Sequence, residues 1–193
     1  MMRLKMIRAF LALELPAPIQ RNLRLLQEEF SFLAREIKWV EEANLHVTLH
    51  FLGSIPAGEV ERVCACAAGV AREMGPFTVE IGGLGVFPPH GKTRVFWAGI
   101  GRGKEELRKL YTNLGTSLAR AGFALESRPY TPHVTLGRFR QPPVAAARLQ
   151  SAIKQREEAT FGSFTAREIA LFESILTPGG PIYRVLQQCQ LGK

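Results

Sequence analysis

The tetrapeptide His-Val-Thr-Leu occurs twice in the chain, at His46–Leu49 and at His133–Leu136. The chain has four histidines, and two of them open these copies. With ordinary residue frequencies of under a tenth each, three matching neighbours arise by chance about once in a few thousand trials. The repetition therefore indicates a shared purpose for the two copies.

Each copy reads as part of a β-strand, in which successive side chains alternate between the two faces. His46 and Thr48 then share one face, as do His133 and Thr135. The valine and leucine of each copy point the other way, into a core. If the copies sit on facing sheets around a pseudo-two-fold axis, two histidines with two threonines flank one bound group across a cleft.

Two imidazoles on opposite sides of one group suit a phosphodiester. In-line displacement places the attacking and leaving oxygens on opposite sides of phosphorus. One imidazole can take a proton from water while the other gives a proton to the departing oxygen, since an unperturbed pKa near ~6.5 serves both roles. The threonine hydroxyls can bond the non-bridging oxygens. This chemistry requires no metal or other cofactor.

The histidines have alternative roles. A single His-x-Thr on a strand is more often a half-buried strand position than a catalytic one, but two identical copies reverse that preference. His46 and His50 would align for a shared ion on a helix. On a strand they lie about 13 Å apart, which disfavours chelation. We expect His50 and His90 to be surface or loop residues.

Composition restricts the class of protein. The chain has 193 residues, of which 46% are hydrophobic, so it can bury a core as a single domain spanning residues 1–193. The 25 basic and 17 acidic residues give a net charge of +8, which attracts anionic substrates. Three cysteines are too few for a disulfide framework, and Cys64-x-Cys66 lacks the second pair of a zinc site. We expect free thiols and a cytoplasmic location.

Strand and helix patterns alternate along the chain, which predicts an α+β fold. Arg8 and Glu14 interrupt the apolar N-terminal stretch, which therefore reads as a strand and not as a signal peptide. No apolar run is long enough to span a bilayer. Strands are predicted at 6–15, 37–40, 46–53, 77–87, 93–100, 132–139, 166–176 and 183–191, and helices at 19–33, 60–70, 107–118 and 145–157.

The chain resembles the two-histidine phosphoesterase superfamily. Within it the chain is similar to the bacterial and archaeal RNA 2′,3′-cyclic phosphodiesterases, also called LigT-like 2′-5′ RNA ligases. Members carry two His-x-Thr-x motifs, and both are intact here. The resemblance covers nearly the whole length, in the segments Arg8–Pro16, Asn44–Gly53, Arg94–Gly99, Arg128–Arg138, Ser174–Leu176 and Gly180–Tyr183.

This resemblance implies two pseudo-symmetric lobes, each an antiparallel sheet with helices packed outside, and an active cleft between the sheets. It also implies that His46 donates the proton to the leaving 3′ oxygen and that His133 activates water, which yields a 2′-phosphate. The identical motifs do not by themselves fix that direction. The implied partner is RNA or an oligonucleotide that ends in a 2′,3′-cyclic phosphate. We expect the protein to be a monomer that does not associate with a membrane.

Three further residues are candidates. An arginine often stands where Arg138 follows the second motif in similar proteins, and it would contact the phosphate. Strict alternation from His133 points Arg138 away from the cleft, whereas a bulge at Gly137 would turn it back. Tyr130 could stack on a base, although packing is the commoner role of an aromatic before a strand. Arg94 is likewise undecided between a role in substrate binding and a structural one.

Two other functions stay open on the sequence. One is a 2′-5′ RNA ligase that joins RNA ends, such as tRNA halves, through the reverse reaction. The other is a non-catalytic RNA-binding module with vestigial histidines. The two intact threonines argue against the second, because decay would have broken one copy of the motif.

Overall fold

The computed structural model describes residues 5–126 and 129–192. Arg128, which opens one of the motif segments, lies outside the described residues. The strands are β1 Met6–Glu14, β2 Ile37–Trp39, β3 His46–Pro56, β4 Phe77–Phe87, β5 Val95–Ile100, β6 His133–Phe139, β7 Thr160–Ala166, β8 Glu168–Thr177 and β9 Gly180–Gln190. The helices are α1 Ala17–Glu29, α2 Val60–Arg72, α3 Lys104–Arg120 and α4 Ala146–Lys154, with single 3₁₀ turns at Ser31–Leu33, Glu42–Asn44 and Ala57–Glu59.

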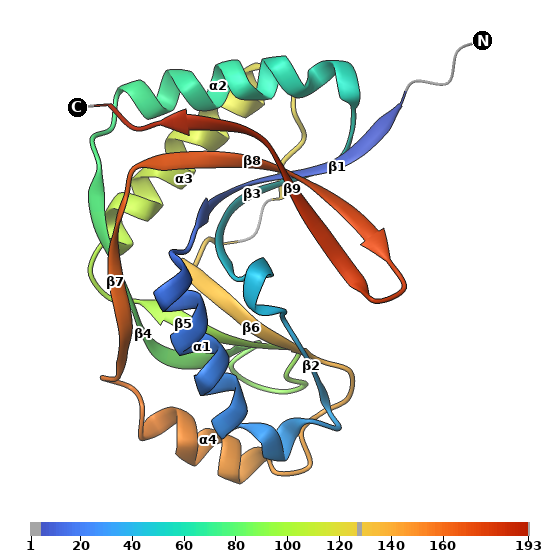
Figure 1. Cartoon of the computed structure of the whole chain (residues 1–193), viewed down its shortest axis with the longest axis vertical. Helices are drawn as coiled ribbons and strands as arrows, with labels where there is room; N and C mark the ends of the chain where they lie inside the picture. Colours follow the sequence, from blue (N-terminus) through green and yellow to red (C-terminus); the bar gives the residue numbers. More distant parts are fainter. Residues whose placement is uncertain (1–4, 127–128, 193) are drawn as a thin grey trace.

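All nine strands join one curled antiparallel sheet (Figure 1). The order is β7-β4-β5-β6-β3-β1-β8-β9, and β2 pairs with β6 beside β3. The strands β1, β3, β8 and β9 are called the β3 half below, and β2, β4, β5, β6 and β7 the β6 half. Among the described residues, the halves are paired at one position, where Val47 of β3 faces Val134 of β6. Both predicted motif strands therefore meet at the centre of the sheet.

Each half is covered by helices on one side. The α2 helix contacts β8 and β9 and α3 contacts β3, while α1 contacts β7 and α4 contacts β4. In Figure 1, α2 and α4 lie at opposite ends of the view, with α3 toward the end of α2 and α1 toward the end of α4. Helix α1 follows β1 of the β3 half but packs on the β6 half, and α3 follows β5 of the β6 half but packs on the β3 half. Each half is thus covered in part by a helix that follows a strand of the other.

Helical spacing explains these contacts. Buried Leu107, Leu110, Leu114 and Leu118 of α3 recur at steps of three and four, which places them on one face of the helix. The α1 helix opens after Pro16 and buries Ile19, Leu23, Leu26 and Gln27 in the same way. The apolar faces of the helices and the valines and leucines of both motifs belong to one continuous core.

The predicted α+β fold with an antiparallel sheet and helices outside is confirmed. The predicted strands and helices are all present, with ends that differ by a few residues. Strand β7 is an addition to the predicted set, because its sequence Thr-Phe-Gly-Ser-Phe-Thr-Ala lacks a clean two-residue alternation. The register between β4 and β7 shifts at Gly162, whose φ of 127° few other residues adopt. Within the described residues, no helix combines the length and the apolarity needed to cross a membrane.

Candidate active site

The two motifs lie side by side in antiparallel register. Val47 pairs with Val134, and both valines are fully buried. Because the strands run in opposite directions, the residue before each valine lies across from the residue after the other. His46 is thus opposite Thr135, and His133 is opposite Thr48. We call the side of the sheet that carries these four polar residues the site face.

Hydrogen bonds fix the orientation of both imidazoles. Nδ1 of His46 lies 2.7 Å from the carbonyl oxygen of Asn44, and Nδ1 of His133 lies 2.7 Å from that of Thr131. A carbonyl can only accept, so Nδ1 carries the proton in each ring and donates it. Nε2 is then the nitrogen that gains or loses a proton at the site. The Thr48 hydroxyl, 2.9 Å away, donates to Nε2 of His46.

The rings lie among aromatic side chains that limit contact with water. The His46 ring is 5.0 Å from Phe10 and 5.4 Å from Tyr183, between ring centroids. The His133 ring is 5.1 Å from Phe87 and 6.2 Å from Trp97. An aromatic environment of this kind strengthens electrostatic interactions with a bound anion.

Burial dominates the acid–base behaviour of the pair. It lowers the pKa of His46 from 6.5 to about 4, assisted by the charges of His133 and Arg138 and opposed by the bond to Asn44. The pKa of His133 is also lowered, mainly by burial and further by the Arg138 charge, against the bond to Thr131. Both shifts favour the neutral form of the imidazoles near pH 7.

Each motif strand bulges at its leucine. On β3, Thr48 and His50 pair with consecutive residues of β1, so Leu49 is the extra residue. On β6, Thr135 and Gly137 pair with consecutive residues of β5, so Leu136 is the extra residue. A bulge reverses the alternation of side chains beyond it. The same irregularity therefore follows both copies of the motif.

The bulge on β6 returns Arg138 to the site face. Arg138 pairs with Val95, and Thr135 pairs with Trp97 two residues along the same strand. Directly paired residues share a face, as do residues two apart on a regular strand, so Arg138 and Thr135 point the same way. In agreement with this position, the positive charge of Arg138 contributes to the lowered pKa values of His46 and His133. The bulge lies beside Gly137, where the sequence allowed for one.

The bulge on β3 has the opposite consequence for His50. This side chain is buried, not a surface or loop residue, so that expectation was wrong. Its ring stacks on Tyr111 of α3 at 4.0 Å, and its Nε2 lies 2.8 Å from the Tyr111 carbonyl oxygen. Burial lowers the pKa of His50. Unbroken alternation would have put His50 beside His46 and Thr48, whereas the extra residue Leu49 turns it into the core.

The remaining histidine and arginine candidates are peripheral. His90 is exposed in the turn between β4 and β5, as predicted. Arg94 is also exposed, and its side chain makes no hydrogen bond or ion pair with another described residue. All three cysteines are free thiols. Within residues 5–126 and 129–192, no three His, Cys, Asp or Glu side chains gather as metal ligands.

Tyr130 packs within the protein, in agreement with the commoner of the two roles considered. Its ring stacks on the other face of Tyr111 at 4.0 Å, and its hydroxyl donates a 3.0 Å hydrogen bond to the Thr48 carbonyl oxygen. Burial raises the pKa of Tyr130, which keeps this hydroxyl protonated. Beyond Val47, β3 and β6 are no longer paired, and the Tyr130 hydroxyl there supplies a hydrogen-bond donor to the Thr48 carbonyl oxygen. One side chain thus links the approach to His133 with the strand of His46.

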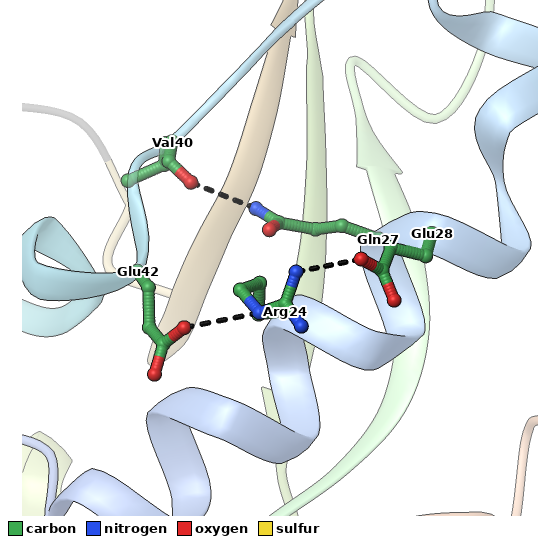
Figure 2. A network of polar contacts seen from close by, with 5 residues as sticks. All are labelled: Arg24, Gln27, Glu28, Val40 and Glu42. Atoms are coloured by element: carbon green, nitrogen blue, oxygen red, sulfur yellow. Dashed lines mark hydrogen bonds and ion pairs between the residues drawn. The ribbon is translucent and has the colours of Figure 1, made fainter.

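Gln27 of α1 supports the backbone of the second motif through its side-chain amide. The sequence patterns did not single it out. Its buried amide donates 2.9 Å hydrogen bonds to the carbonyl oxygens of Leu136, the bulged residue, and Val40. Figure 2 shows the bond to Val40 beside the exposed Arg24, which contacts Glu28 and Glu42. A glutamine on the apolar face of a predicted helix was the available signal, because buried polar groups require partners.

Comparisons with known proteins agree with this geometry. The sequence profile of the family described as LigT-like phosphoesterase matches residues 13–97 and 100–183. A Methanocaldococcus jannaschii protein named RNA 2′,3′-cyclic phosphodiesterase is 32% identical over 182 residues, which cover 94% of this chain and 99% of the relative.

Solved structures show the same architecture. A Thermus thermophilus protein superposes with a TM-score of 0.81 at 29% identity, covering 97% of this chain and 100% of that chain. Escherichia coli LigT complexed with 3′-AMP superposes with a TM-score of 0.80 at 25% identity, covering 98% and 100% of the two chains. The match to the profile spans both copies of the motif and most of the chain, and the protein belongs to the LigT-like phosphoesterase family.

Proposed function

We propose that this protein hydrolyses 2′,3′-cyclic phosphate ends of RNA to 2′-phosphates by acid–base catalysis with His46 and His133. The name of the Methanocaldococcus relative gives the activity and the substrate, and the LigT neighbour is complexed with a nucleoside phosphate. These comparisons favour hydrolysis over ligation. The regiochemistry and the roles of single residues are part of the proposal.

In the proposed reaction His133 Nε2 accepts a proton from water as the water oxygen attacks phosphorus. The bond between phosphorus and the 3′ oxygen breaks, and protonated Nε2 of His46 gives its proton to that oxygen. The product carries a 2′-phosphate and a 3′-hydroxyl. A second proton exchange with solvent restores both rings. The reaction consumes one water and needs neither ATP nor a metal ion.

The other predicted site residues hold the phosphate. The Thr48 hydroxyl, which donates to Nε2 of His46 in the free protein, becomes able to donate to a non-bridging oxygen once that nitrogen is protonated, and the Thr135 hydroxyl lies on the same face for the same role. The Arg138 guanidinium offers the positive charge that matches the charge developing on these oxygens. Arg138 has no counterpart in the β3 half, where the bulged strand places Phe51 at the equivalent position.

One observation carries the proposal: two identical motifs bring their imidazoles to one face through the Val47–Val134 pair, with Nδ1 of each ring bonded to a carbonyl. A metal-free mechanism needs this arrangement, because both protons move through Nε2. A core role would not need two matched rings that are each held through Nδ1 and so leave Nε2 to exchange a proton. The direction of the proton transfers rests on family resemblance.

The deciding experiment incubates the purified protein with a nucleoside 2′,3′-cyclic phosphate in EDTA, without ATP. We expect turnover, with phosphorus NMR showing a 2′-phosphate. Loss of activity in EDTA with recovery on adding zinc or magnesium would overturn the metal-free mechanism. A 3′-phosphate product would reverse the assignment of the leaving oxygen.

A further inference from the structure

Two cations stand directly across from each other beside the candidate active site. Lys38 of β2 pairs with Arg138 of β6, and neither side chain forms an ion pair with another described residue. Both side chains are exposed. Like charges directly opposite on neighbouring strands destabilise a sheet. An anion bound between or beside them would remove that cost.

Lys38 lies on the site face. Its neighbours Ile37 and Trp39 point the other way, since both would contact a Cβ at Gly137, whose partner Phe96 is in the core. Lys38 therefore shares a side with Arg138. It continues the row of polar groups outward from His133 and Thr135, past the proposed position of the cyclic phosphate.

The tip of the β8–β9 hairpin marks the outer edge of this row. A Cβ at Gly180 would lie 3.6 Å from the Lys38 Nζ. Nearby, the Asn44 side chain donates a 2.9 Å hydrogen bond to the carbonyl oxygen of Pro181. Asn44 is also the residue whose carbonyl orients His46. Lys38 is thus held between Arg138 and a hairpin that is tied to the active site.

We propose that Lys38 binds the phosphate that precedes the cyclic end, so that the site face accepts an RNA strand and not a terminal nucleotide alone. The inference rests on the proposed function, in which Arg138 holds the terminal phosphate. The next charge along an RNA strand is one nucleotide away, and Lys38 supplies the adjacent cation. The net charge of +8 favours the same polyanion.

The test compares two substrates with the Lys38→Ala variant: a nucleoside 2′,3′-cyclic phosphate and a five-nucleotide RNA with the same end. We expect KM for the RNA to rise about threefold at moderate salt, and the slope of log KM against log salt to fall by about 0.7, as for one lost phosphate contact on a single strand. Both kinetic constants for the nucleoside substrate should stay unchanged. Lys38→Arg should retain most of the affinity for RNA.

Lys109→Ala is the matched control, because Lys109 is an exposed lysine on α3, on the other side of the sheet. It changes the charge equally and should leave KM for both substrates unchanged. Equal effects of Lys38→Ala on both substrates, or none on the RNA, would overturn the inference. Turnover of the nucleoside substrate by the unaltered protein tests the proposed function separately. Fluorescence anisotropy with a 2′-phosphate-ended RNA measures the Lys38 contact without turnover.

Discussion

Both imidazoles donate from Nδ1 to the carbonyl two residues earlier, so the residues just before each motif orient its ring in the same way. Their surroundings nevertheless differ. His46 is packed among Phe10, Phe172 and Tyr183, and its Nε2 accepts a hydrogen bond from Thr48. His133 instead lies against Phe87 and Trp97. Two identical tetrapeptides thus place their imidazoles in different environments, and the difference comes from the packing around them.

At the residue scale, alanine at either His46 or His133 should lower kcat by roughly 10²–10⁴, the usual worth of one positioned acid or base. The double variant should lose far less than the product of the two effects, because the residues act as a unit. Steady-state rates with a nucleoside 2′,3′-cyclic phosphate measure this. Circular dichroism checks that each variant is folded. A folded single variant with near-full turnover would refute the two-histidine mechanism.

Binding of the product should draw a proton onto His46. Its pKa of about 4 leaves the ring neutral at pH 6.5, whereas a phosphate anion beside it favours the imidazolium. Titration calorimetry with a nucleoside 2′-phosphate, in buffers of different ionisation enthalpy, should therefore show proton uptake. The His46→Ala variant should take up fewer protons. The uptake that remains in this variant measures the protons taken by the phosphate itself. Equal uptake in both proteins would mean that His46 is not the acid.

At the element scale, Tyr130 is where the two motif strands are connected beyond their single pair. Tyr130→Phe keeps the stack on Tyr111 but removes the bond to the Thr48 carbonyl. We expect kcat to fall about three- to tenfold with little change in KM, since one buried hydrogen bond is worth about 0.5–1.5 kcal/mol.

Tyr111→Phe is the control for this change, because its hydroxyl makes no hydrogen bond with another described residue. It should leave kcat unchanged. A Tyr130→Phe enzyme with normal kcat and only reduced thermal stability would show that Tyr130 serves the fold and not the geometry of Thr48.

The elements themselves could be predicted well where a periodic pattern marks one buried face. The strands of both motifs and the leucine-rich α3 are examples. The predictions about strands that failed share one cause. A bulge changes which face of the sheet the following side chains point to, and the composition of the strand does not reveal it. The extra residue Leu49 buried His50, and the irregularity at Gly162 obscured β7. The contacts of Gln27 and Tyr130 could not be predicted either, because their partners are backbone carbonyls distant in sequence.

At the scale of the whole molecule, the lowered pKa of the half-buried His46 affects stability. The unfolded chain protonates His46 near pH 6.5, but the folded chain, with its lowered pKa, does so only near pH 4. The unfolded state thus binds more protons as the pH falls through this range, and the free energy of unfolding must decrease. Relative to His46→Asn, the unaltered protein should lose about 1–3 kcal/mol between pH 7 and pH 4.

Urea unfolding at several pH values measures this difference, and the other titrating groups largely cancel between the two proteins. Parallel curves of unfolding free energy against pH would show that the folded protein protonates His46 as easily as the unfolded chain does.

The two halves are not separable pieces of chain. Each half is covered by a helix that follows a strand of the other, and β1 from the start of the chain pairs with β8 from near its end. We therefore propose that residues 1–193 fold as one domain, as the sequence predicts. Because the strands of the two halves alternate along the sequence, no single cut of the chain would separate one half from the other.

The pairing of β1 with β8 also sets the order of events on the ribosome. β1 can pair with β3 as soon as β3 has been synthesised, but the other edge of β1 has no partner until β8 follows. That edge carries Phe10 and Leu11, which are buried in the finished protein. An open apolar edge is a template for pairing with another chain. That edge of β1 therefore stays open until β8 has been synthesised and has paired with it.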